Sequence, residues 1–321
     1  MPTAVQVTRT GGPEVLEVAE IEVRAPQASE LLVDVAAAGV NYIDTYQRQG
    51  VYPMELPVVL GLEGSGTVAE VGPDVTGFAP GDRVAWQGSI GSYASRKVVP
   101  AAIAVKVPEG VSLETAAATM LQGVTAHYLV ASTYEVKPGD DVLVHAAAGG
   151  VGLLLVQLAK ARGARVIATV STDEKAKLAR EAGADEVIGY EDFAKVTREL
   201  TGGVGVDVVY DGVGKDTYEG SLASLKIRGL LALFGASSGA VPPINPQALN
   251  SGGSLYLTRP TSAHYSRTRE ELEWRSKELF DAILAGDLNI RIGGTYPLAD
   301  ARRAHEDLQG RRTTGKLLLI P

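Results

Sequence analysis

The chain has 321 residues, of which 45% are hydrophobic and 21% are charged, and its formal net charge is −8. This length exceeds the usual size of one domain, so two domains with substantial cores are expected. Cysteine is absent, which excludes disulfides, thiolate catalysis, iron–sulfur clusters and zinc sites with cysteine ligands.

Acidic and basic residues are mixed along the chain, and their negative balance disfavours broad electrostatic binding to nucleic acid. No apolar run approaches the ~20 residues needed to cross a bilayer. The segment Met1–Val5 shows no basic stretch leading into an apolar one, so no signal peptide is expected. The sequence therefore predicts a cytoplasmic protein that does not enter membranes.

The first part of the chain contains short apolar or alternating runs separated by glycine and proline turns, such as Gly72–Asp74 and Pro80–Asp82. Four of these runs are predicted to be strands: Leu31–Ala38, Gly66–Val71, Arg83–Trp86 and Ala94–Val99. A helix is predicted around Asn41–Gln49. Short strands at this density favour a compact antiparallel barrel.

From Val136 onward, strands alternate with helices. The predicted strands are Asp141–Ala146, Ala164–Val170, Asp185–Ile188, Val206–Tyr210 and Gly229–Phe234. The helices predicted between them include Gly150–Arg162 and Thr172–Ala182. This alternation predicts a parallel sheet with both faces covered, and the near-continuous apolar strands fit such burial.

The C-terminal part returns to a pattern like that of the first part. Its predicted elements are two helices and a last strand: Glu270–Ala285, Leu298–Gln309 and Lys316–Ile320. We therefore predict a barrel domain over residues 1–125, a nucleotide-binding domain over 126–262, and a segment over 263–321 that returns to the first domain. The cleft between two domains is a common place for a ligand.

A glycine-rich turn, Ala146–Gly152, lies between a predicted strand and a predicted helix. A dinucleotide-binding fold needs small residues here for a tight turn, for close approach of backbone N–H groups to pyrophosphate, and for helix–strand packing. The helix N-terminus adds a partial positive charge. Gly149 and Gly152 supply two glycines of the G-x-G-x-x-G pattern, whereas Ala147 replaces the first.

The end of the second predicted strand bears on the choice of cofactor. Folds that bind NAD usually carry an acidic residue there, about 20 residues past the turn. Counting from Gly152 (171 − 152 = 19) leads to Ser171, so the acid is missing. Ser171 and Thr172 offer hydroxyl groups, and Lys175 offers a charge-assisted donor to a 2′-phosphate. The sequence therefore predicts NADPH as the cofactor.

Taken together, these motifs give the chain a resemblance to zinc-free quinone oxidoreductases of the medium-chain dehydrogenase/reductase superfamily, the zeta-crystallin group. The matching segments are Gly11–Leu16, Gly39–Asp44, Gly81–Val84, His145–Gly152, Tyr210–Gly214, Phe234–Gly235 and Ser254–Pro260. The resemblance implies an α/β protein with a GroES-like, mostly antiparallel β-barrel domain and a Rossmann domain with a doubly wound parallel sheet. It also implies NADPH as hydride donor and a homodimer joined through the edges of the Rossmann sheets.

The resemblance further implies which residues contact the cofactor. Those expected near the nicotinamide are Asn41, Tyr46, Thr125, Tyr128, Phe234, Gly235 and Ser237. Gly150 and Val151 are expected at the pyrophosphate. The residues expected at the adenosine 2′-phosphate are Ser171, Lys175, Tyr190 and Arg311.

Zinc alcohol dehydrogenases of the superfamily use cysteine and histidine ligands, and their G-H-E motif appears here as Gly61–Glu63 with leucine in the middle. Metal-assisted alcohol oxidation is therefore disfavoured, and no metal is expected. The four histidines, which show no zinc-like spacing, are expected to pack in the core or lie on the surface; they are His127, His145, His264 and His305.

A quinone suits a site without a metal because its ring is already electrophilic, so that positioning it against the dihydronicotinamide carries much of the catalysis. Tyr46 and Tyr52 are the candidate substrate-binding residues. Either phenol can donate a hydrogen bond to a quinone oxygen or stack on the ring, or it can pack inside the barrel. Asn41 is expected to orient cofactor and substrate.

Two other functions stay open at this point. The same scaffold can use NADPH to reduce α,β-unsaturated carbonyls or enoyl thioesters, because these too are electrophilic conjugated systems. A nucleotide-regulated RNA-binding protein or a structural protein is the alternative of another class, which the negative charge and the intact glycine turn disfavour.

Overall fold

The computed structural model describes residues 1–321, and they divide into two compact units. The first unit comprises Met1–Val124 together with Ser266–Pro321, and the second comprises Thr125–Tyr265. Each unit has its own sheets and its own buried apolar core.

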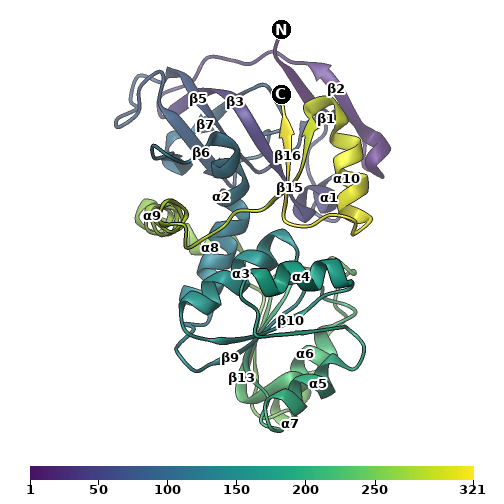
Figure 1. Cartoon of the computed structure of the whole chain (residues 1–321). Helices are drawn as coiled ribbons and strands as arrows, with labels where there is room; N and C mark the ends of the chain where they lie inside the picture. The colour runs from purple at the N-terminus through teal and green to yellow at the C-terminus, as the bar shows by residue number, and fades with distance from the viewer. The chain divides into compact units, whose positions relative to one another are not determined.

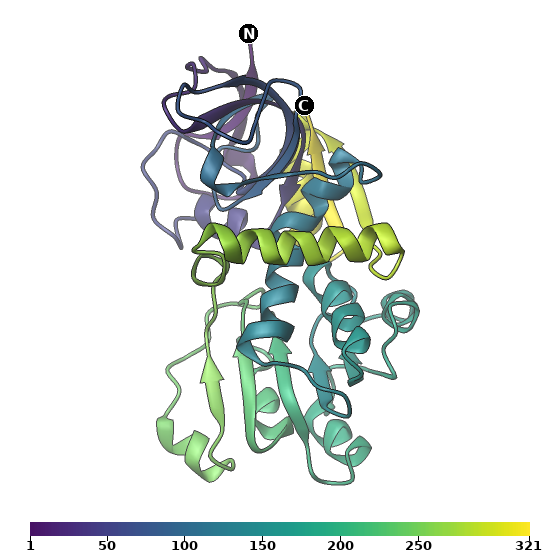
Figure 2. The same cartoon turned by 90° about the vertical axis from the view of Figure 1, so that its left-hand side faces the viewer.

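The first unit is built on two sheets. The smaller has the order β2-β1-β4, with β1 at Thr3–Val7, β2 at Leu16–Glu20 and β4 at Val58–Val59. The larger has the order β15-β16-β3-β5-β6-β8, and β7 pairs with β3. Its strands are β3 (Glu30–Val40), β5 (Glu63–Val71), β6 (Arg83–Gln87), β7 (Arg96–Pro100), β8 (Ala104–Lys106), β15 (Ile292–Pro297) and β16 (Lys316–Ile320). Only β15 and β16 pair in parallel, which confirms the prediction of a mostly antiparallel β-barrel domain (Figure 2).

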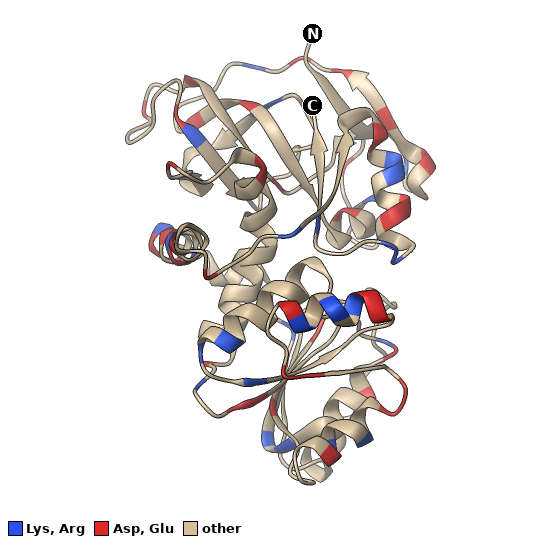
Figure 3. Ribbon diagram, viewed as in Figure 1, with Lys and Arg blue, Asp and Glu red and all other residues tan.

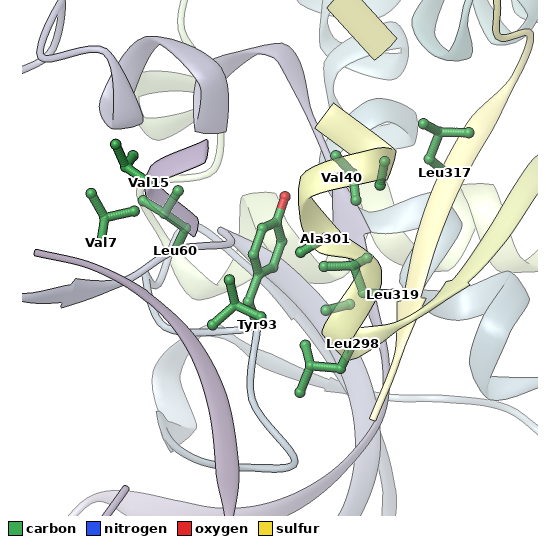
Figure 4. Packing of buried hydrophobic residues seen from close by; sticks show 12 residues of the cluster. Val7, Val15, Val40, Leu60, Tyr93, Leu298, Ala301, Leu317 and Leu319 are labelled. Carbon is green, nitrogen blue, oxygen red and sulfur yellow. The ribbon is translucent and has the colours of Figure 1, made fainter. Parts of the chain in front are cut away.

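The last strand of the chain lies inside this barrel sheet. β16 pairs on one side with β15 and on the other with β3, where Leu317 is opposite Val40 and Leu319 is opposite Ala38. Residues from the two ends of the sequence therefore share one core. Figure 4 shows part of it, with Leu317 and Leu319 near Val40.

Four α-helices belong wholly or in part to the first unit: α1 (Tyr42–Arg48), α2 (Leu113–Tyr128), α9 (Arg269–Ala285) and α10 (Ala301–Gln309). α9 is the long helix of Figure 2. It starts with a capping box, in which the Thr268 side chain accepts from the Glu271 N–H and the Glu271 carboxylate accepts from the Thr268 N–H. It ends at Gly286, whose φ of +81° is the left-handed conformation that glycine adopts readily.

The second unit holds a six-stranded, all-parallel sheet in the order β11-β10-β9-β12-β13-β14. Its strands are β9 (Asp141–Val144), β10 (Arg165–Thr169), β11 (Glu186–Ile188), β12 (Val206–Asp211), β13 (Leu225–Leu233) and β14 (Tyr256–Thr258). Numbered along the chain, this order is 3-2-1-4-5-6, the order of dinucleotide-binding sheets. The expected Rossmann fold is confirmed.

Helices cover both faces of the parallel sheet. The α-helices that follow α2 in this unit are α3 (Gly150–Ala161), α4 (Asp173–Glu181), α5 (Phe193–Leu200), α6 (Tyr218–Ser224), α7 (Pro246–Ser251) and α8 (Ser262–Tyr265). Figure 1 shows α3 and α4 on one side of the sheet and α5 and α6 on the other. Charged residues of both signs follow one another along α4 (Figure 3). No helix of the chain combines the length and the apolar character needed to span a bilayer.

Several predicted boundaries were wrong, each for a local reason. The strand predicted at Asp141–Ala146 ends at Val144, because Ala146 turns out of the strand with a φ of +50°. The strand predicted from Ala94 starts at Arg96, since Ala94 makes only an isolated bridge. The helix predicted from Leu298 begins with a 3-10 turn and becomes α-helical at Ala301.

Several elements were not predicted, among them β1, β2 and α2. β1 and β2 are short, and β2 alternates only weakly because three of its five residues are exposed. α2 is buried on most of its surface, so its sequence lacks the apolar stripe that marks an amphipathic helix.

Candidate functional site

The glycine-rich turn leads from β9 into α3 in the second unit. The Ala147 N–H donates to the Thr169 carbonyl at 3.1 Å, and the Gly149 N–H donates to the Ala146 carbonyl at 2.8 Å. Gly149 is the N-cap of α3, so Gly150 and Val151 form the first turn of the helix, where backbone N–H groups have no partner within the helix. This is the arrangement that binds a phosphate in dinucleotide folds.

The third glycine of the pattern, Gly152, is required by the packing of the turn. A Cβ at this position would lie 2.3 Å from the Ala146 carbonyl oxygen and 2.7 Å from the Ala147 Cα. Both are backbone atoms that cannot move aside, so only glycine lets α3 start this close to the turn. The turn also lies beside the switch point of the sheet, since β9 and β12 are neighbours while their following helices cover opposite faces.

A directed chain of hydrogen bonds lies beneath the turn. Ser221 donates its hydroxyl hydrogen to Asp211 at 2.8 Å, so at 3.0 Å it accepts from Nε2 of His145. Nδ1 of His145 then accepts from the Thr169 hydroxyl at 2.8 Å. Burial lowers the pKa of His145 to about 4, which fits a neutral ring. The chain ties together the ends of β9, β10 and β12.

Three of the residues predicted at the 2′-phosphate, Ser171, Lys175 and Tyr190, lie in the second unit after β10. Ser171 and Thr172 are exposed, and the Thr172 hydroxyl caps α4 by accepting from the Lys175 N–H at 3.3 Å. Lys175 Nζ lies 3.4 Å from the Ser171 hydroxyl. Tyr190 accepts from the Ala146 N–H at 2.9 Å and stacks against His145 at 6.0 Å between ring centroids. These residues lie together at one end of the sheet, beside the glycine turn.

The residues predicted on the nicotinamide side lie in separate segments of this unit. Phe234, Gly235 and Ser237 follow β13 directly, and all three are half-buried. Thr125 is half-buried in α2, and Tyr128 is buried and stacks in parallel on Tyr265 at 4.5 Å.

The tyrosines of the first unit lie around α1. Tyr46 is half-buried, and its ring contacts Tyr52 edge-to-face at 5.9 Å and Tyr42 at 6.3 Å. Tyr52 is 44% exposed. The alternative that Tyr52 packs inside the barrel is therefore wrong, whereas Tyr46 is partly covered by aromatic neighbours.

Asn41 is buried and precedes α1. Its side-chain Nδ2 donates to Oε1 of Glu63 at 2.6 Å, and its Oδ1 accepts from Nζ of Lys316 at 2.8 Å. Its backbone N–H donates to Asp44 at 2.8 Å. The Asn41 amide is thus engaged by neighbours inside the barrel. Arg311, predicted at the 2′-phosphate, is exposed in the loop after α10 of the same unit.

A second buried polar network attaches α1 to α10. The Tyr93 hydroxyl donates to Asp44 at 2.8 Å and lies 3.1 Å from Nε2 of His305, whose Nδ1 accepts from Arg48 at 2.9 Å. Arg48 also donates to Gln309 at 2.8 Å. Burial raises the pKa of Asp44 to about 7 and lowers that of His305 to about 3. Figure 4 shows the Tyr93 ring among apolar side chains.

Sequence reasoning did not select the members of these networks as a set. Lys316 carried one signal, because it is a charged residue at the start of an otherwise apolar strand. Asn41 was selected through the family resemblance and Glu63 was noted in the altered motif, whereas Asp44, Tyr93 and His305 gave no signal of a shared site. Of the histidines, His264 is exposed and the other three are buried.

Comparison with known proteins gives full-length matches. Residues 27–109 match the family model described as the alcohol dehydrogenase GroES-like domain, and residues 150–274 match the one described as zinc-binding dehydrogenase. Quinone oxidoreductase 1 of Escherichia coli is 48% identical, with 100% of both chains covered. The 2-haloacrylate reductase of a Burkholderia species is 44% identical, covering 100% of this chain and 99% of the relative.

Among solved structures, an Escherichia coli quinone oxidoreductase complexed with NADPH superposes with a TM-score of 0.97 at 47% identity, covering 99% of this chain and 100% of the other.

The residues present do not fit the zinc named in the second family description. The chain has no cysteine, and Leu62 occupies the histidine position of the G-H-E motif. Glu63, the remaining motif residue, is bonded to Asn41 and Lys316. No three histidine or acidic side chains lie close enough together to hold a metal ion.

Proposed function

Because the chain belongs to the quinone oxidoreductase family of the medium-chain dehydrogenase/reductase superfamily, we propose that it transfers hydride from NADPH to a quinone. The overall reaction takes up one proton and yields NADP⁺ and a hydroquinone. The observation that supports this most strongly is the full-length similarity to Quinone oxidoreductase 1 of Escherichia coli, combined with a glycine-rich turn at the N-terminus of α3.

The residues of the second unit fit NADPH. Gly149, Gly150, Val151 and Gly152 would hold the pyrophosphate through the turn and the start of α3. No acidic residue follows β10 directly, and Ser171, Thr172, Lys175 and Tyr190 would hold the 2′-phosphate together with Arg311. The residues proposed to contact the nicotinamide end are Asn41, Tyr46, Thr125, Tyr128, Phe234, Gly235 and Ser237. When bound, NADPH supplies the hydride.

The side chains of the first unit would position the acceptor. Tyr46 and Tyr52 offer two phenol rings in edge-to-face contact, one half-buried and one exposed. Such rings can stack on a quinone or donate to its oxygen as negative charge develops there. No residue is assigned as an obligatory acid, so water can deliver the proton to the product oxygen.

A steady-state screen tests this function. Oxidation of NADPH and of NADH by the wild-type protein would be measured against a panel of quinones and a panel of α,β-unsaturated carbonyls. We expect quinone-dependent oxidation, at least about tenfold better with NADPH than with NADH because of the charge-assisted contacts to the phosphate, and unaffected by a chelator. Absence of turnover with every quinone would contradict the proposal.

The second candidate is reduction of an activated carbon–carbon double bond. It is favoured by the full-length similarity to a 2-haloacrylate reductase. Turnover of the unsaturated carbonyls in preference to the quinones would select this alternative, with the same cofactor.

The proposal includes a homodimer joined along β14, and a cytoplasmic location where NADPH is available. β14 ends the parallel sheet and pairs only with β13. Tyr256 on β14 is 60% exposed and Ile227 on β13 is 73% exposed. An edge strand flanked by exposed apolar side chains is a surface that a second copy can extend.

A further inference from the structure

The buried ion pair of the barrel is more extensive than one contact. Both side chains are almost fully excluded from solvent, with 1% of Lys316 and none of Glu63 exposed. The second oxygen of Glu63 accepts from the Leu121 N–H at 2.6 Å, and Gln122 Nε2 donates to Asn41 Oδ1 at 3.3 Å. Both Glu63 oxygens and the Asn41 oxygen are therefore satisfied.

The cluster is packed tightly against β3. A Cβ on Gly39 would lie 2.3 Å from the Glu63 carboxylate and 2.6 Å from Cε of Lys316, so only glycine leaves room for the pair. The charges are also placed where the superfamily's G-H-E motif is altered, because Glu63 is its third residue. The ammonium of Lys316 forms an ion pair with this glutamate.

A buried ion pair is a poor way to gain stability. The cost of removing two charges from water is repaid only when the remaining hydrogen bonds are also made, and apolar residues of similar volume often serve as well. The two charges do determine which way the Asn41 amide faces. Rotating the Asn41 amide by half a turn would place its NH₂ against the ammonium and its oxygen against the carboxylate.

We propose that Lys316 and Glu63 are positioning residues that hold the Asn41 amide in one orientation at the nicotinamide end of the proposed active site. This inference rests on the proposed function, because it assigns Asn41 to that site. The neighbouring bond from the Asn41 N–H to Asp44 fixes the backbone of the same residue, so that main chain and side chain are both held.

Removing the pair as a unit tests the inference. Glu63→Gln/Lys316→Met deletes both charges with little change in volume and leaves neither charge stranded, unlike Lys316→Met alone. Lys97→Met is the matched control, since Lys97 is a buried lysine of the same unit that donates only to the carbonyls of Ser89 and Ile90.

We expect the double variant to fold but to lose at least about tenfold in kcat/KM for NADPH, the loss expected when charge-assisted bonds no longer fix Asn41. The Lys97→Met control should keep the wild-type kcat/KM, because Lys97 bonds only to the carbonyls of Ser89 and Ile90 and not to Asn41. Wild-type kcat/KM and NADPH affinity in the double variant would overturn the inference.

A second measurement separates this inference from the proposed function. The side-chain NH₂ of Asn41 can be followed by ¹⁵N–¹H NMR, assigned with Asn41→Asp. We expect slow exchange with water in the wild type and at least about tenfold faster exchange in the double variant, because a neutral amide oxygen accepts more weakly than the carboxylate and Lys316 no longer holds the Asn41 oxygen. If the wild type turns over no quinone, the proposed function fails while this result still decides the positioning. Unchanged exchange would overturn it.

The orientation itself is tested by moving the charge. Asn41→Asp places a second carboxylate against Glu63 and should lower the unfolding midpoint. Asn41→Asp/Glu63→Gln restores the net charge of the cluster and should recover part of that loss in a double-variant cycle. If Asn41→Asp were as stable as Asn41→Asp/Glu63→Gln, the NH₂ group would not face Glu63 and the proposal would fail.

Discussion

Lys175 and Lys177 are two residues apart on α4 but differ in their surroundings. Lys175 is half-buried, and its ammonium lies 3.4 Å from the hydroxyl of Ser171. Ser171 occupies the position where NAD-binding folds usually carry an acidic residue. The Lys177 side chain is 79% exposed and lies 3.9 Å from Glu181, one helical turn away. One lysine therefore lies among the residues proposed to bind the 2′-phosphate, and the other belongs to the solvated face.

Replacing each lysine in turn tests the choice of cofactor. Lys175→Ala should lower kcat/KM for NADPH at least about tenfold and leave that for NADH unchanged, because one charge-assisted bond to the phosphate is lost. Lys177→Ala is the control and should change neither. An unchanged NADPH/NADH ratio in Lys175→Ala would show that this lysine does not read the phosphate.

Tyr46 is the side chain whose two proposed roles can be separated most cleanly. Tyr46→Phe keeps the ring contacts with Tyr42 and Tyr52 but removes the hydroxyl. If the hydroxyl stabilises the developing oxyanion, kcat falls while NADPH affinity is retained. We expect stacking and orientation to dominate, because quinones need little electrophilic help, so Phe should be nearly silent and Tyr46→Ala should lose activity. A large fall in kcat for Tyr46→Phe would contradict this expectation.

At the scale of elements, α1 is a helix of seven residues that cannot be stable alone. Its position depends on the strands and the helix around it. Tyr93 reaches it through Asp44, and α10 reaches it through Arg48 and through the bond from the Tyr42 hydroxyl to the Leu308 carbonyl at 3.1 Å. The C-terminal segment thus fixes the helix that carries Tyr46.

Asp44 makes this attachment pH-dependent. Burial keeps the carboxyl protonated in the folded chain up to about pH 7, whereas in the unfolded chain it ionises near its ordinary pKa of 3.8. Between these values the folded state binds more protons, so the contribution of Asp44 to stability is full below about pH 4 and is lost as the pH rises to about 7.

Asp44→Asn should therefore gain stability relative to the wild type as the pH rises from about 4 to about 7, by at most about 1.4 kcal/mol per pH unit. Denaturant unfolding of both proteins across this window measures the difference. His145 and His305 titrate with the opposite sign, since burial lowers the pKa of both, but they are present in both proteins and cancel. Parallel stability curves would contradict the assignment.

At the scale of the whole molecule, the free edge of the parallel sheet bears on assembly. Sedimentation of the wild type should show a dimer, and Tyr256→Asp should shift it toward a monomer, because a charge on β14 opposes burial of the edge. Val204→Asp is the control, since Val204 is 62% exposed but lies in the loop before β12. Dissociation by both variants, or by neither, would argue against a dimer through β14.

The sequence alone determined the features that depend on local pattern. Alternating strands and helices from Val136 predicted the parallel sheet, and the small residues of Ala146–Gly152 predicted the phosphate turn, because each depends on neighbours in the chain. The missing acid after β10 could be counted directly. The absence of cysteine was enough by itself to argue against a zinc site with cysteine ligands, because composition does not depend on the fold.

Tertiary structure alone decided which polar residues share a buried site. The start of α1 carries both Asn41 and Asp44, but their partners come from distant segments: Glu63 and Lys316 for Asn41, and Tyr93 for Asp44. No spacing along the chain could pair them. Folding removes water from these groups, so each must form its hydrogen bonds with the few partners that the barrel provides. Their charges and hydrogen-bond directions become important only then.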